Sequence, residues 1–411
     1  MTSFCCRSCG STRAHTVLDL GLQPLANNLL RPEDLGAEEP RFPLVMAVCN
    51  DCWLLQITET VPPVKLFTEY LYFSSVSDAL LNHARNAAQR YRQDYQLDSK
   101  SLVVEVASND GYLLQNFVET SIPCLGVEPA RNIAEVARER GIPTWNQFFN
   151  TSTALEIVAQ KGAADLILGN NVFAHAPDTN DFVAGLATLV KPHGRIVLEF
   201  PYACDLVEHL EFDTIYHEHV FYFTLTALVP LFRRHDLEIF HAERIPIHGG
   251  SLRIFVGKSG AHSVTNAVTQ LLAEERTKGV DTPNYYENFS RKVLALKAEL
   301  LKLIGDLRSQ GHRLCAYGAS AKGSTLLNFY GLGREGVDCL DFVVDRSAAK
   351  QGRLTPGTHL PILPVEELMT RKPRHALLLT WNFSEEILRQ QQAWRDAGGK
   401  FILPIPEVKI V

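Results

Sequence analysis

No stretch of the 411-residue sequence is apolar over the roughly 20 residues that a helix needs to span a bilayer. The N-terminus also lacks the basic and then apolar pattern of a signal peptide. A basic surplus is missing too, because 40 Lys and Arg residues stand against 46 Asp and Glu residues, a formal net charge of −6. We therefore expect a cytosolic protein with neither membrane nor nucleic acid as its partner. No coiled-coil heptads call for a dimer, so we expect a monomer.

The nine cysteines are not spread as a disulfide framework would require. Four of them stand alone in apolar contexts and are expected to be reduced core thiols: Cys124, Cys204, Cys315 and Cys339. Near the start, two C-x-x-C pairs can supply four thiolates in a tetrahedron, the geometry of structural zinc: Cys6, Cys9, Cys49 and Cys52. Cys5 could replace Cys6, but the spacing to Cys9 favours Cys6. A shell of four thiolates is closed, so we expect no catalysis at this metal.

The rest of the sequence alternates short apolar strands with helices, which favours an α/β fold with a doubly wound parallel sheet. Strands are expected at 102–106, 124–127, 165–168 and 195–200, after a helix at about 77–95. A long helix at about 287–310 has a predicted buried stripe formed by Leu294, Leu296, Leu300, Leu301, Ile304 and Leu307. It leads into a second strand-turn-helix unit at 313–323, with further strands at 342–345 and 376–379. We therefore predict three parts, a zinc-binding module (1–67), a cofactor-binding domain (68–260) and a C-terminal Rossmann-like domain (261–411).

The first strand-turn-helix unit ends in Glu105-Val-Ala-Ser-Asn-Asp-Gly111, with a helix expected from near Tyr112 whose N-terminus would face a ligand. Glu128 ends the next strand, where a carboxylate can accept both hydroxyls of an adenosine ribose. NAD enzymes require glycines where Ala107 and Asn109 stand, whereas S-adenosylmethionine has no phosphate to cradle. The turn therefore favours S-adenosylmethionine over NAD, with a turn that binds no ligand as the remaining alternative. The expected cofactor-binding residues are Glu105, Ala107, Ser108, Asn109, Gly111, Tyr112, Glu128, Pro129, Asn170 and Asn171.

Asn170, Asn171 and His175 follow the strand at 165–168, where its carboxyl end would line the space between methyl donor and acceptor. The densest group of ionisable side chains comes later, in Tyr216-His217-Glu218-His219, flanked by aromatic residues that exclude water. Exclusion of water shifts the pKa values of ionisable side chains, so this segment is a candidate to supply a general base. A metal bound by His217 and His219 is the alternative, although no third ligand is obvious nearby.

These motifs occur in one order over the whole sequence, and together they resemble the S-adenosylmethionine-dependent C-methyltransferases of nucleotide-activated keto-deoxysugars, notably the carbon-3 enzymes of TDP-sugar pathways. The resemblance covers the cysteine pairs, the donor turn 108–111, the segment 216–219, the stretch 248–253 and the turn 317–323. The departures are the additional Cys5 and Ala107, where a glycine is common. The resemblance implies that the central domain is a class I methyltransferase domain and that the C-terminal domain binds the nucleotide sugar.

The resemblance also implies a base-assisted alkylation of carbon 3, which the 4-keto group of the sugar acidifies. His219 would be the base, with Tyr216 and Glu218 placing it and the sugar. Tyr70 and His175 would bind the keto oxygen or neighbouring hydroxyls, and the choice of Tyr70 over Tyr72 rests on the resemblance. In the second Rossmann-like unit, backbone amides, Ser320 and Lys322 would hold the pyrophosphate, with Asp345 on the sugar of the nucleotide. The expected substrate-binding residues are Tyr72, Tyr222, His248, Gly249, Gly250, Ser251, Tyr317, Gly318, Ser320, Lys322, Asp345 and Lys350.

Two other functions remain open from the sequence. One is an S-adenosylmethionine-dependent O- or N-methyltransferase, which needs no base for a carbon acid. The other is a nonenzymatic zinc-ribbon binding protein, although no basic patch lies near Cys6 to Cys52. The nucleotide base, the group on carbon 3 and the face that receives the methyl group are not readable from the sequence.

Overall fold

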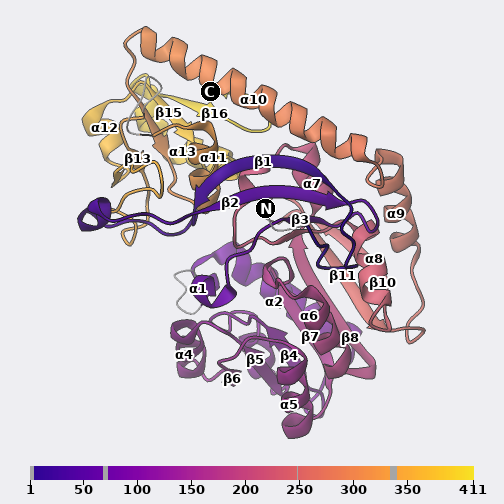
Figure 1. Cartoon of the computed structure of the whole chain (residues 1–411). Coiled ribbons are helices and arrows are strands. Elements are labelled where there is room, and N and C mark those ends of the chain that lie inside the picture. The colour runs from indigo at the N-terminus through magenta and orange to yellow at the C-terminus, as the bar shows by residue number, and fades with distance from the viewer. Residues whose placement is uncertain (1–3, 68–72, 248, 334–339) are drawn as a thin grey trace.

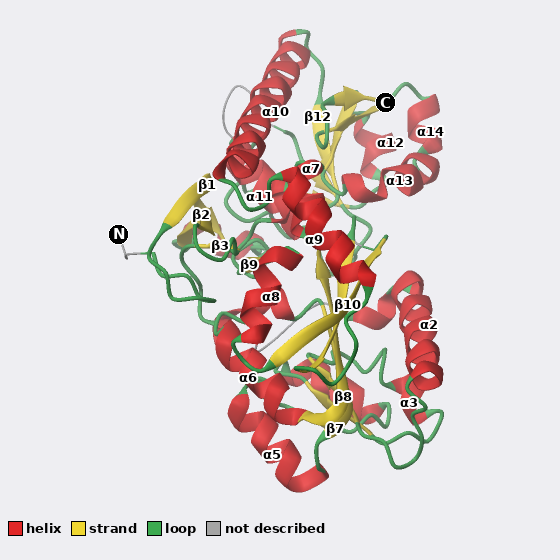
Figure 2. Cartoon of the chain, turned by 90° about the vertical axis from the view of Figure 1, so that its right-hand side faces the viewer, coloured by secondary structure: helices red, strands yellow, loops and turns green. Residues whose placement is uncertain are grey.

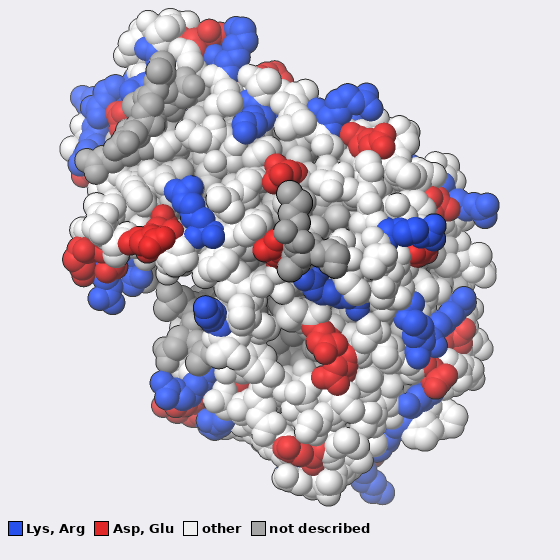
Figure 3. Space-filling model, in the orientation of Figure 1, with Lys and Arg blue, Asp and Glu red and all other residues white. Residues whose placement is uncertain are grey.

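A computed structural model describes residues 4–67, 73–247, 249–333 and 340–411. The chain forms three separate sheets (Figure 1). Within the described ranges no helix is both long enough and apolar enough to cross a membrane. On the face shown in Figure 3, acidic and basic side chains are interspersed and do not gather into a patch of one sign.

The N-terminal sheet has the strand order β1-β2-β3-β9, and its last strand comes from the middle of the chain. Its strands are β1 (Ala14–Pro24), β2 (Arg41–Cys49), β3 (Leu55–Ile57) and β9 (Phe221–Tyr222). β1 and β2 form a long antiparallel hairpin, and β3 pairs with β9 through Leu55↔Tyr222 and Gln56↔Phe221. The short helix α1 (Pro63–Phe67) follows β3. The segment after His219 is therefore part of the sheet that carries the cysteine pairs.

The middle sheet has seven strands in the order β10-β11-β8-β7-β4-β5-β6. They are β4 (Val103–Val106), β5 (Cys124–Val127), β6 (Thr144–Trp145), β7 (Ala164–Asn170), β8 (Val190–Pro201), β10 (Leu237–Ile245) and β11 (Ser251–Lys258). The pairs from β6 to β8 are parallel, and β11 runs antiparallel to both of its neighbours. The four strands predicted from the sequence are confirmed, each within a few residues.

Helices cover both faces of this sheet, with α2 and α3 on one side and α5 and α6 on the other (Figure 2). The helices of this part are α2 (Asp78–Asp94), α3 (Gln115–Val118), α4 (Arg131–Glu139), α5 (Thr151–Lys161), α6 (Thr179–Leu189), α7 (Ala203–Glu208) and α8 (Leu225–Arg233). α2 confirms the predicted helix, and the hydroxyl of Ser77 caps it by accepting from the amide of Leu80. The helix expected from Tyr112 is wrong in its start and length, because residues 111–114 form turns and α3 begins at Gln115.

The C-terminal sheet has the order β14-β13-β12-β15-β16-β17 and is parallel except for β17. Its strands are β12 (Leu314–Tyr317), β13 (Val343–Val344), β14 (Ile362–Leu363), β15 (His375–Leu378), β16 (Lys400–Leu403) and β17 (Lys409–Ile410). Its helices are α11 (Ala321–Tyr330), α12 (Glu367–Arg371), α13 (Ser384–Gln390) and α14 (Gln392–Asp396). The second Rossmann-like unit is thus β12-turn-α11, as predicted.

The connecting helices are α9 (Asn266–Lys278) and the long α10 (Pro283–Ser309), which runs along the outside of the molecule toward the C-terminal sheet (Figure 1). The buried stripe of α10 consists of Tyr286, Phe289, Val293, Leu296, Leu300, Ile304 and Leu307. Its three-to-four-residue spacing puts Val293 inside and turns Leu294, which is 51% exposed, outward. The predicted stripe was therefore wrong at Leu294, and Leu301 is only partly buried.

Candidate functional site

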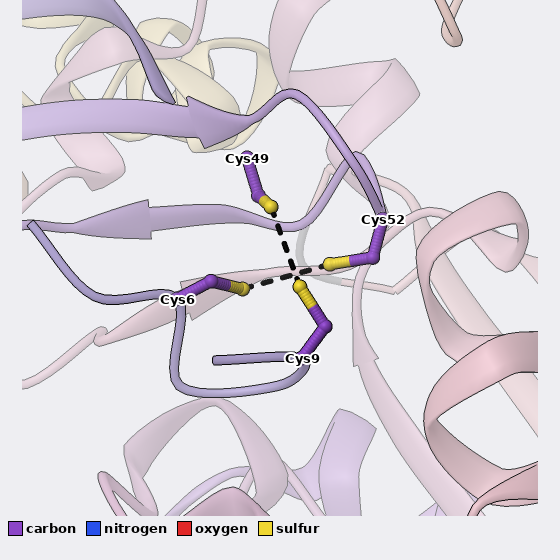
Figure 4. A group of neighbouring side chains, drawn as sticks. All are labelled: Cys6, Cys9, Cys49 and Cys52. Atoms are coloured by element: carbon purple, nitrogen blue, oxygen red, sulfur yellow. Dashed lines mark hydrogen bonds between the residues drawn. The ribbon is translucent and has the colours of Figure 1, made fainter. Parts of the chain in front are cut away.

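The four predicted zinc ligands come together at one end of the N-terminal sheet (Figure 4). Their Sγ atoms lie within 4.8 Å of one another, with Cys6 and Cys52 3.5 Å apart and Cys9 and Cys49 3.6 Å apart. A tetrahedron with Zn–S bonds of about 2.3 Å has edges of about 3.8 Å, so these thiols fit zinc. Cys5 is exposed and lies outside the cluster, so the choice of Cys6 is confirmed.

The cluster is built into the sheet around it. The Gln56 amide donates to Cys6 Sγ at 3.3 Å, and the guanidinium of Arg7 donates to the Ile57 carbonyl at 2.8 Å. The contact with Cys52 lowers the pKa of the Cys6 thiol, which favours the thiolate form that zinc binds. The zinc ligands therefore hold β3, which in turn pairs with β9.

The donor turn joins β4 to α3 in a tight conformation. Ala107 and Asn109 have φ angles of 53° and 49°, the left-handed region that glycine occupies without strain. Gly111 has a φ of 78°, and a Cβ there would stand 2.6 Å from Ile142 Cγ1. Glu128 is 5% exposed, and its carboxylate accepts from the amides of Asn109 and Ala130, each at 2.9 Å. Burial raises the pKa of Glu128 to about 7.

Three buried polar atoms beside this turn have no hydrogen-bond partner within the described chain: Glu105 Oε2, Ser108 Oγ and Asp110 Oδ1. Burial, with the nearby carboxylates of Glu128 and Asp110, raises the pKa of Glu105 well above its ordinary value. Unsatisfied polar atoms in a protein interior are costly and are usually explained by a ligand or water. This donor set fits a polar cofactor such as S-adenosylmethionine, with Glu128 available to its ribose hydroxyls.

The other predicted cofactor residues surround this turn. The amide of Asn170, the last residue of β7, donates to the hydroxyl of Tyr112 at 3.4 Å, and the Asn171 amide donates to the Glu199 carbonyl at 2.7 Å. The carbonyl of Pro129 accepts from the side chain of Asn146 at 2.9 Å. The side chain of Asn109 accepts from the amide of Ser74 at 2.8 Å, which ties the turn to the segment that precedes α2.

His219 is partly buried among aromatic and histidine side chains. Its Nδ1 lies 2.8 Å from the Thr214 carbonyl, and its Nε2 lies 3.0 Å from the Tyr216 hydroxyl. Because a carbonyl can only accept, Nδ1 carries the proton and Nε2 accepts from the Tyr216 hydroxyl. Burial, with His175 and Lys322 nearby, lowers the pKa of His219 well below its ordinary value. The imidazole is therefore neutral at physiological pH, with a lone pair on Nε2.

His175 and Glu218 lie next to this imidazole. The rings of His175 and His219 have centroids 4.9 Å apart, and His175 Nδ1 donates to the Glu218 carbonyl at 2.7 Å. Burial lowers the pKa of His175 to about 4 and raises that of Glu218 to about 6. Tyr222 is buried behind His219, with its hydroxyl donating to the Thr214 carbonyl at 3.4 Å. The structure thus brings four predicted residues of the 216–222 region and His175 together.

His217 faces away from this group. Its Nε2 donates to the Pro43 carbonyl at 3.3 Å, and its ring packs edge-on against Phe42 at a centroid distance of 5.7 Å. His217 and His219 therefore have separate partners, which argues against a shared metal. Within the described residues, the four cysteines are the one group with metal-ligand geometry.

The turn of the second Rossmann-like unit satisfies most of its own polar groups. Asp345 accepts from the amides of Ala319 and Ser347, each at 2.7 Å, and Lys350 donates to the Ala319 carbonyl at 2.8 Å. The Ser320 hydroxyl caps α11 by accepting from the Gly323 amide at 3.1 Å. Asp345, Lys350 and Ser320 therefore shape the turn, a role that the sequence did not predict.

The remaining predicted substrate residues lie in different surroundings. Tyr317 is 3% exposed, and its ring packs against Phe401 in the core of the C-terminal sheet. Gly318 has a φ of 92°, and a Cβ there would stand 2.6 Å from Thr380 Cγ2. Gly249 and Gly250 also have positive φ angles, and Ser251 Oγ donates to the Ile247 carbonyl at 3.0 Å. Tyr70, Tyr72 and His248 lie outside the described residues.

A cluster that the sequence did not reveal joins the C-terminal unit to the loop at residues 213–215. Asp213 is wholly buried and accepts from the indole of Trp381 at 2.7 Å, while Lys322 Nζ lies 5.1 Å from the centroid of the Trp381 ring. The Thr325 hydroxyl donates to the Ile215 carbonyl at 3.2 Å. The signal in the sequence was Asp213 itself, an acid within an aromatic stretch, but its partner lies 168 residues away. α11 and Trp381 therefore hold the loop that precedes His219.

Comparison with known proteins gives matches to three family models. They are a zinc binding domain over residues 6–67, a methyltransferase domain over residues 80–242 and a C-methyltransferase C-terminal domain over residues 246–406. Among curated proteins, C-methyltransferase NovU of Streptomyces niveus is 36% identical over 407 residues, which cover 99% of this chain and 96% of NovU.

Solved structures match about two fifths of the chain. A S-adenosylmethionine-dependent methyltransferase from Clostridium acetobutylicum is 11% identical with a TM-score of 0.36, over 44% of this chain and 92% of its own. Magnesium protoporphyrin IX methyltransferase from Synechocystis with bound S-adenosylmethionine is 12% identical with a TM-score of 0.33, over 44% of this chain and 79% of its own.

The sequence relatives decide between the functions that the sequence left open. The NovU match covers the entire architecture, so a nonenzymatic zinc protein and an O- or N-methyltransferase are set aside in favour of carbon methylation. The cofactors are S-adenosylmethionine and zinc, for which the four cysteines have the geometry. The chain belongs to the family of S-adenosylmethionine-dependent C-methyltransferases with an N-terminal zinc-binding module.

Proposed function

We propose that this enzyme methylates carbon 3 of a nucleotide-activated 4-keto-deoxysugar, with TDP as the nucleotide, in the biosynthesis of branched-chain deoxysugars. The observation that carries the proposal is the neutral, partly buried His219, whose Nε2 accepts from the Tyr216 hydroxyl at 3.0 Å. The carbon beside a ketone becomes a nucleophile after it loses a proton. The ketone makes this proton acidic enough for a histidine to remove it as general base. A C-methyltransferase needs such a base, whereas transfer to oxygen or nitrogen does not.

In this mechanism His219 takes the proton from carbon 3, and the electron pair of that C–H bond moves toward the keto oxygen to give an enolate. The enolate carbon then attacks the methyl carbon of the donor, the sulfur–methyl bond breaks, and the electron pair of that bond stays on sulfur. S-Adenosylmethionine supplies the electrophilic methyl group. The proton on His219 returns to solvent after the product leaves, so one proton is released for each methyl group transferred.

The neighbours of His219 each have a proposed role. The Tyr216 hydroxyl keeps Nε2 as the acceptor, and the Thr214 carbonyl fixes the ring through Nδ1. Tyr70 and His175 are the proposed donors to the enolate oxygen or to sugar hydroxyls. Preorganised donors at a developing negative charge are commonly the largest electrostatic contribution to catalysis. The carboxylate of Glu218 supports the positive charge that His219 gains.

We assign the nucleotide to the C-terminal unit, at the turn between β12 and α11. Lys322 supplies the charge for the diphosphate, and its position above Trp381 holds it beside the catalytic loop. Asp345 and Lys350 keep the turn in its shape through their bonds to Ala319 and Ser347. Gly249 and Gly250 let the loop before β11 pass close to two carboxylates, because a Cβ on Gly250 would stand 2.2 Å from Asp205 Oδ2.

The decisive experiment incubates the native enzyme with S-adenosylmethionine and a panel of TDP-, GDP- and UDP-4-keto-deoxysugars. We expect a methyl gain on the TDP sugar, and, in heavy water with S-adenosylhomocysteine in place of the donor, one deuterium at carbon 3. His219→Asn should lose both signals by about 10²-fold or more. His193→Gln, an exposed histidine on β8, is the control and should keep both. Methylation without deuterium entry in the native enzyme, or full turnover in His219→Asn, would refute the mechanism.

A further inference from the structure

Asn27, a residue of the N-terminal module, reaches into the catalytic segment. Its side-chain amide donates to Glu218 Oε1 at 2.6 Å, across 191 positions of sequence. Asn27 itself is exposed, whereas Glu218 is 7% exposed. Within the described chain, no other group donates a hydrogen bond to the Glu218 carboxylate, and no lysine or arginine pairs with it. Asn27 is therefore the partner that partly offsets the burial of this acid.

The turn that carries Asn27 is fixed from both sides. Behind β1, the Asn28 amide donates to the Leu25 carbonyl at 3.1 Å, and the Leu29 amide donates to the Asn27 carbonyl at 3.0 Å. Directly afterwards, Leu30 forms an antiparallel bridge with Leu354 of the C-terminal domain, with N–O distances of 3.0 and 2.9 Å. A side chain on such a pinned turn loses little entropy when it binds Glu218.

A second contact binds the same two domains further along the hairpin. The Glu39 carboxylate, just before β2, accepts from the Gly357 amide at 2.9 Å and from the ring of His359 at 3.1 Å. Arg41 donates to the Gly357 carbonyl at 3.2 Å. The N-terminal module is thus tied to the C-terminal domain at Leu30 and again at Glu39 and Arg41, while β3 holds the 216–222 segment through β9.

We infer that Asn27 is a positioning residue of the proposed active site, through which the zinc module holds the carboxylate of Glu218, the residue before His219, ionised and in one orientation. The inference rests on the proposed function, in which Glu218 supports the charge that develops on His219. The titratable groups nearest to Glu218 in the described chain are His175, which bonds its carbonyl, and the adjacent residues His217, which points toward Pro43, and His219. None of these is a permanent cation, so the amide of Asn27 is the constant influence on the carboxylate.

The sign of the effect follows from the chemistry of the bond. An amide N–H stabilises the carboxylate over the carboxylic acid, and Asn27 accordingly opposes the rise that burial imposes on the pKa of Glu218. Removing Asn27 should raise that pKa further, by about one unit for a lost hydrogen bond to a charged group. The acid limb of kcat should then move to higher pH by about one unit, so kcat should fall by about twofold at neutral pH and by up to about tenfold on the acid limb.

The test compares Asn27→Ala and the isosteric Asn27→Asp with Asn28→Ala, whose side chain makes no hydrogen bond in the described structure. Zinc content, melting temperature and the Kd for S-adenosylmethionine should be alike in all three, whereas the pH profile of kcat shifts only in the two Asn27 variants. Asn27→Asp should shift further, since it sets a second carboxylate beside the first. In a Glu218→Gln background, Asn27→Ala should cost nothing more, because its partner is gone.

Infrared titration of the carboxyl groups gives a readout that does not need turnover. The band that disappears in Glu218→Gln should titrate at higher pH in Asn27→Ala than in the native enzyme. If this band and the pH profile are the same in Asn27→Ala and Asn28→Ala, the inference is wrong. If the native enzyme methylates no ketosugar, the proposed function fails, and the infrared titration alone then decides whether Asn27 governs Glu218.

Discussion

The two strand-turn-helix units of this enzyme have the same architecture, but they differ in whether the buried polar groups at the turn have hydrogen-bond partners. The turn after β4 leaves three buried polar atoms without partners, at Glu105, Ser108 and Asp110. The turn after β12 is closed by its own residues, since Asp345 occupies the Ala319 amide and Ser320 occupies the Gly323 amide. The first turn is built to be completed by a deeply enclosed ligand, whereas the second offers a preformed surface to one.

The comparison also explains why one acidic residue at the same place in each unit has a different function. Glu128 and Asp345 both follow the strand next to the turn, and both accept backbone amides. Burial raises the pKa of Glu128 to about 7, so its charge depends on what binds beside it. Asp345 lies next to Lys350, with 3.8 Å between Nζ and Oδ2, and needs no ligand to be compensated. Under the proposed assignment, Glu128 binds the cofactor, whereas Asp345 shapes its turn.

The largest expected effect comes from removing zinc. Turnover, which depends on the 216–222 segment, should be lost, whereas S-adenosylmethionine binding at the turn after β4 should be kept. Zinc contributes on the order of 10 kcal/mol to the folding of small modules, so chelation or Cys49→Ser should unfold the N-terminal sheet. β9 then loses its partner strand and turnover should fall below detection, while calorimetry should still show S-adenosylmethionine binding within about threefold of native. Loss of cofactor binding together with turnover would show that the two regions are not separable. Cys124→Ser, a cysteine outside the cluster, is the control.

Replacing the acid of each unit by alanine should have a different effect in the two units. Glu128→Ala should weaken S-adenosylmethionine binding by about 10²-fold, because it removes charge-assisted hydrogen bonds to the ribose. Asp345→Ala should leave that Kd unchanged and lower the free energy of unfolding by about 2 kcal/mol, because two backbone amides lose their acceptor. Calorimetry with the cofactor and urea unfolding measure the two quantities. Equal effects of both variants on cofactor binding would contradict the division of labour proposed for the turns.

The smallest effect concerns pH and is confined to the first unit. Because the pKa of Glu128 is raised from 4.5 to about 7 in the folded protein, the folded state binds a proton that the unfolded state releases. The stability of the ligand-free enzyme should therefore fall as pH rises through this window, and the share of Glu128 is about 1 to 3 kcal/mol. Glu128→Gln should flatten that part of the curve. Cofactor affinity should rise over the same range, since the ribose needs the carboxylate, and a pH-independent Kd would contradict the assignment.

Local features of the sequence were sufficient to predict a large part of this molecule. Spacing identified the four zinc ligands, and apolar runs identified the strands of both parallel sheets, because each depends on residues close together in the chain. The predictions were wrong where adjacent residues could take the same structural role. At Leu294 the helix could have buried either of two adjacent side chains, and at Tyr112 a compact turn took the place of the first helical residues.

What the sequence could not show are the contacts that join distant segments. Nothing near Phe221 indicates that it pairs with Gln56, and nothing near Asp213 indicates that its partner is Trp381. Such contacts depend on the register and packing of whole domains, which no local pattern specifies. The candidate base, His219, was therefore predictable as a residue, but the Thr214 carbonyl and the Tyr216 hydroxyl that fix its tautomer required the structure. The predicted limits of the three domains and the individual roles of the site residues stay predictions.

The β3–β9 pairing also has a consequence for biosynthesis. Leu55 leaves the ribosome long before its partner Tyr222, and Leu30 waits still longer for Leu354. Contacts between such distant positions form late and slow the folding of a chain. The metal can therefore gather the first cysteines early, but the N-terminal sheet reaches its final width only after the methyltransferase sheet has emerged. Translation that stops before the C-terminal domain would leave Leu30 without its bridging partner Leu354, and the loosened 25–31 turn would be exposed to chaperones and proteases.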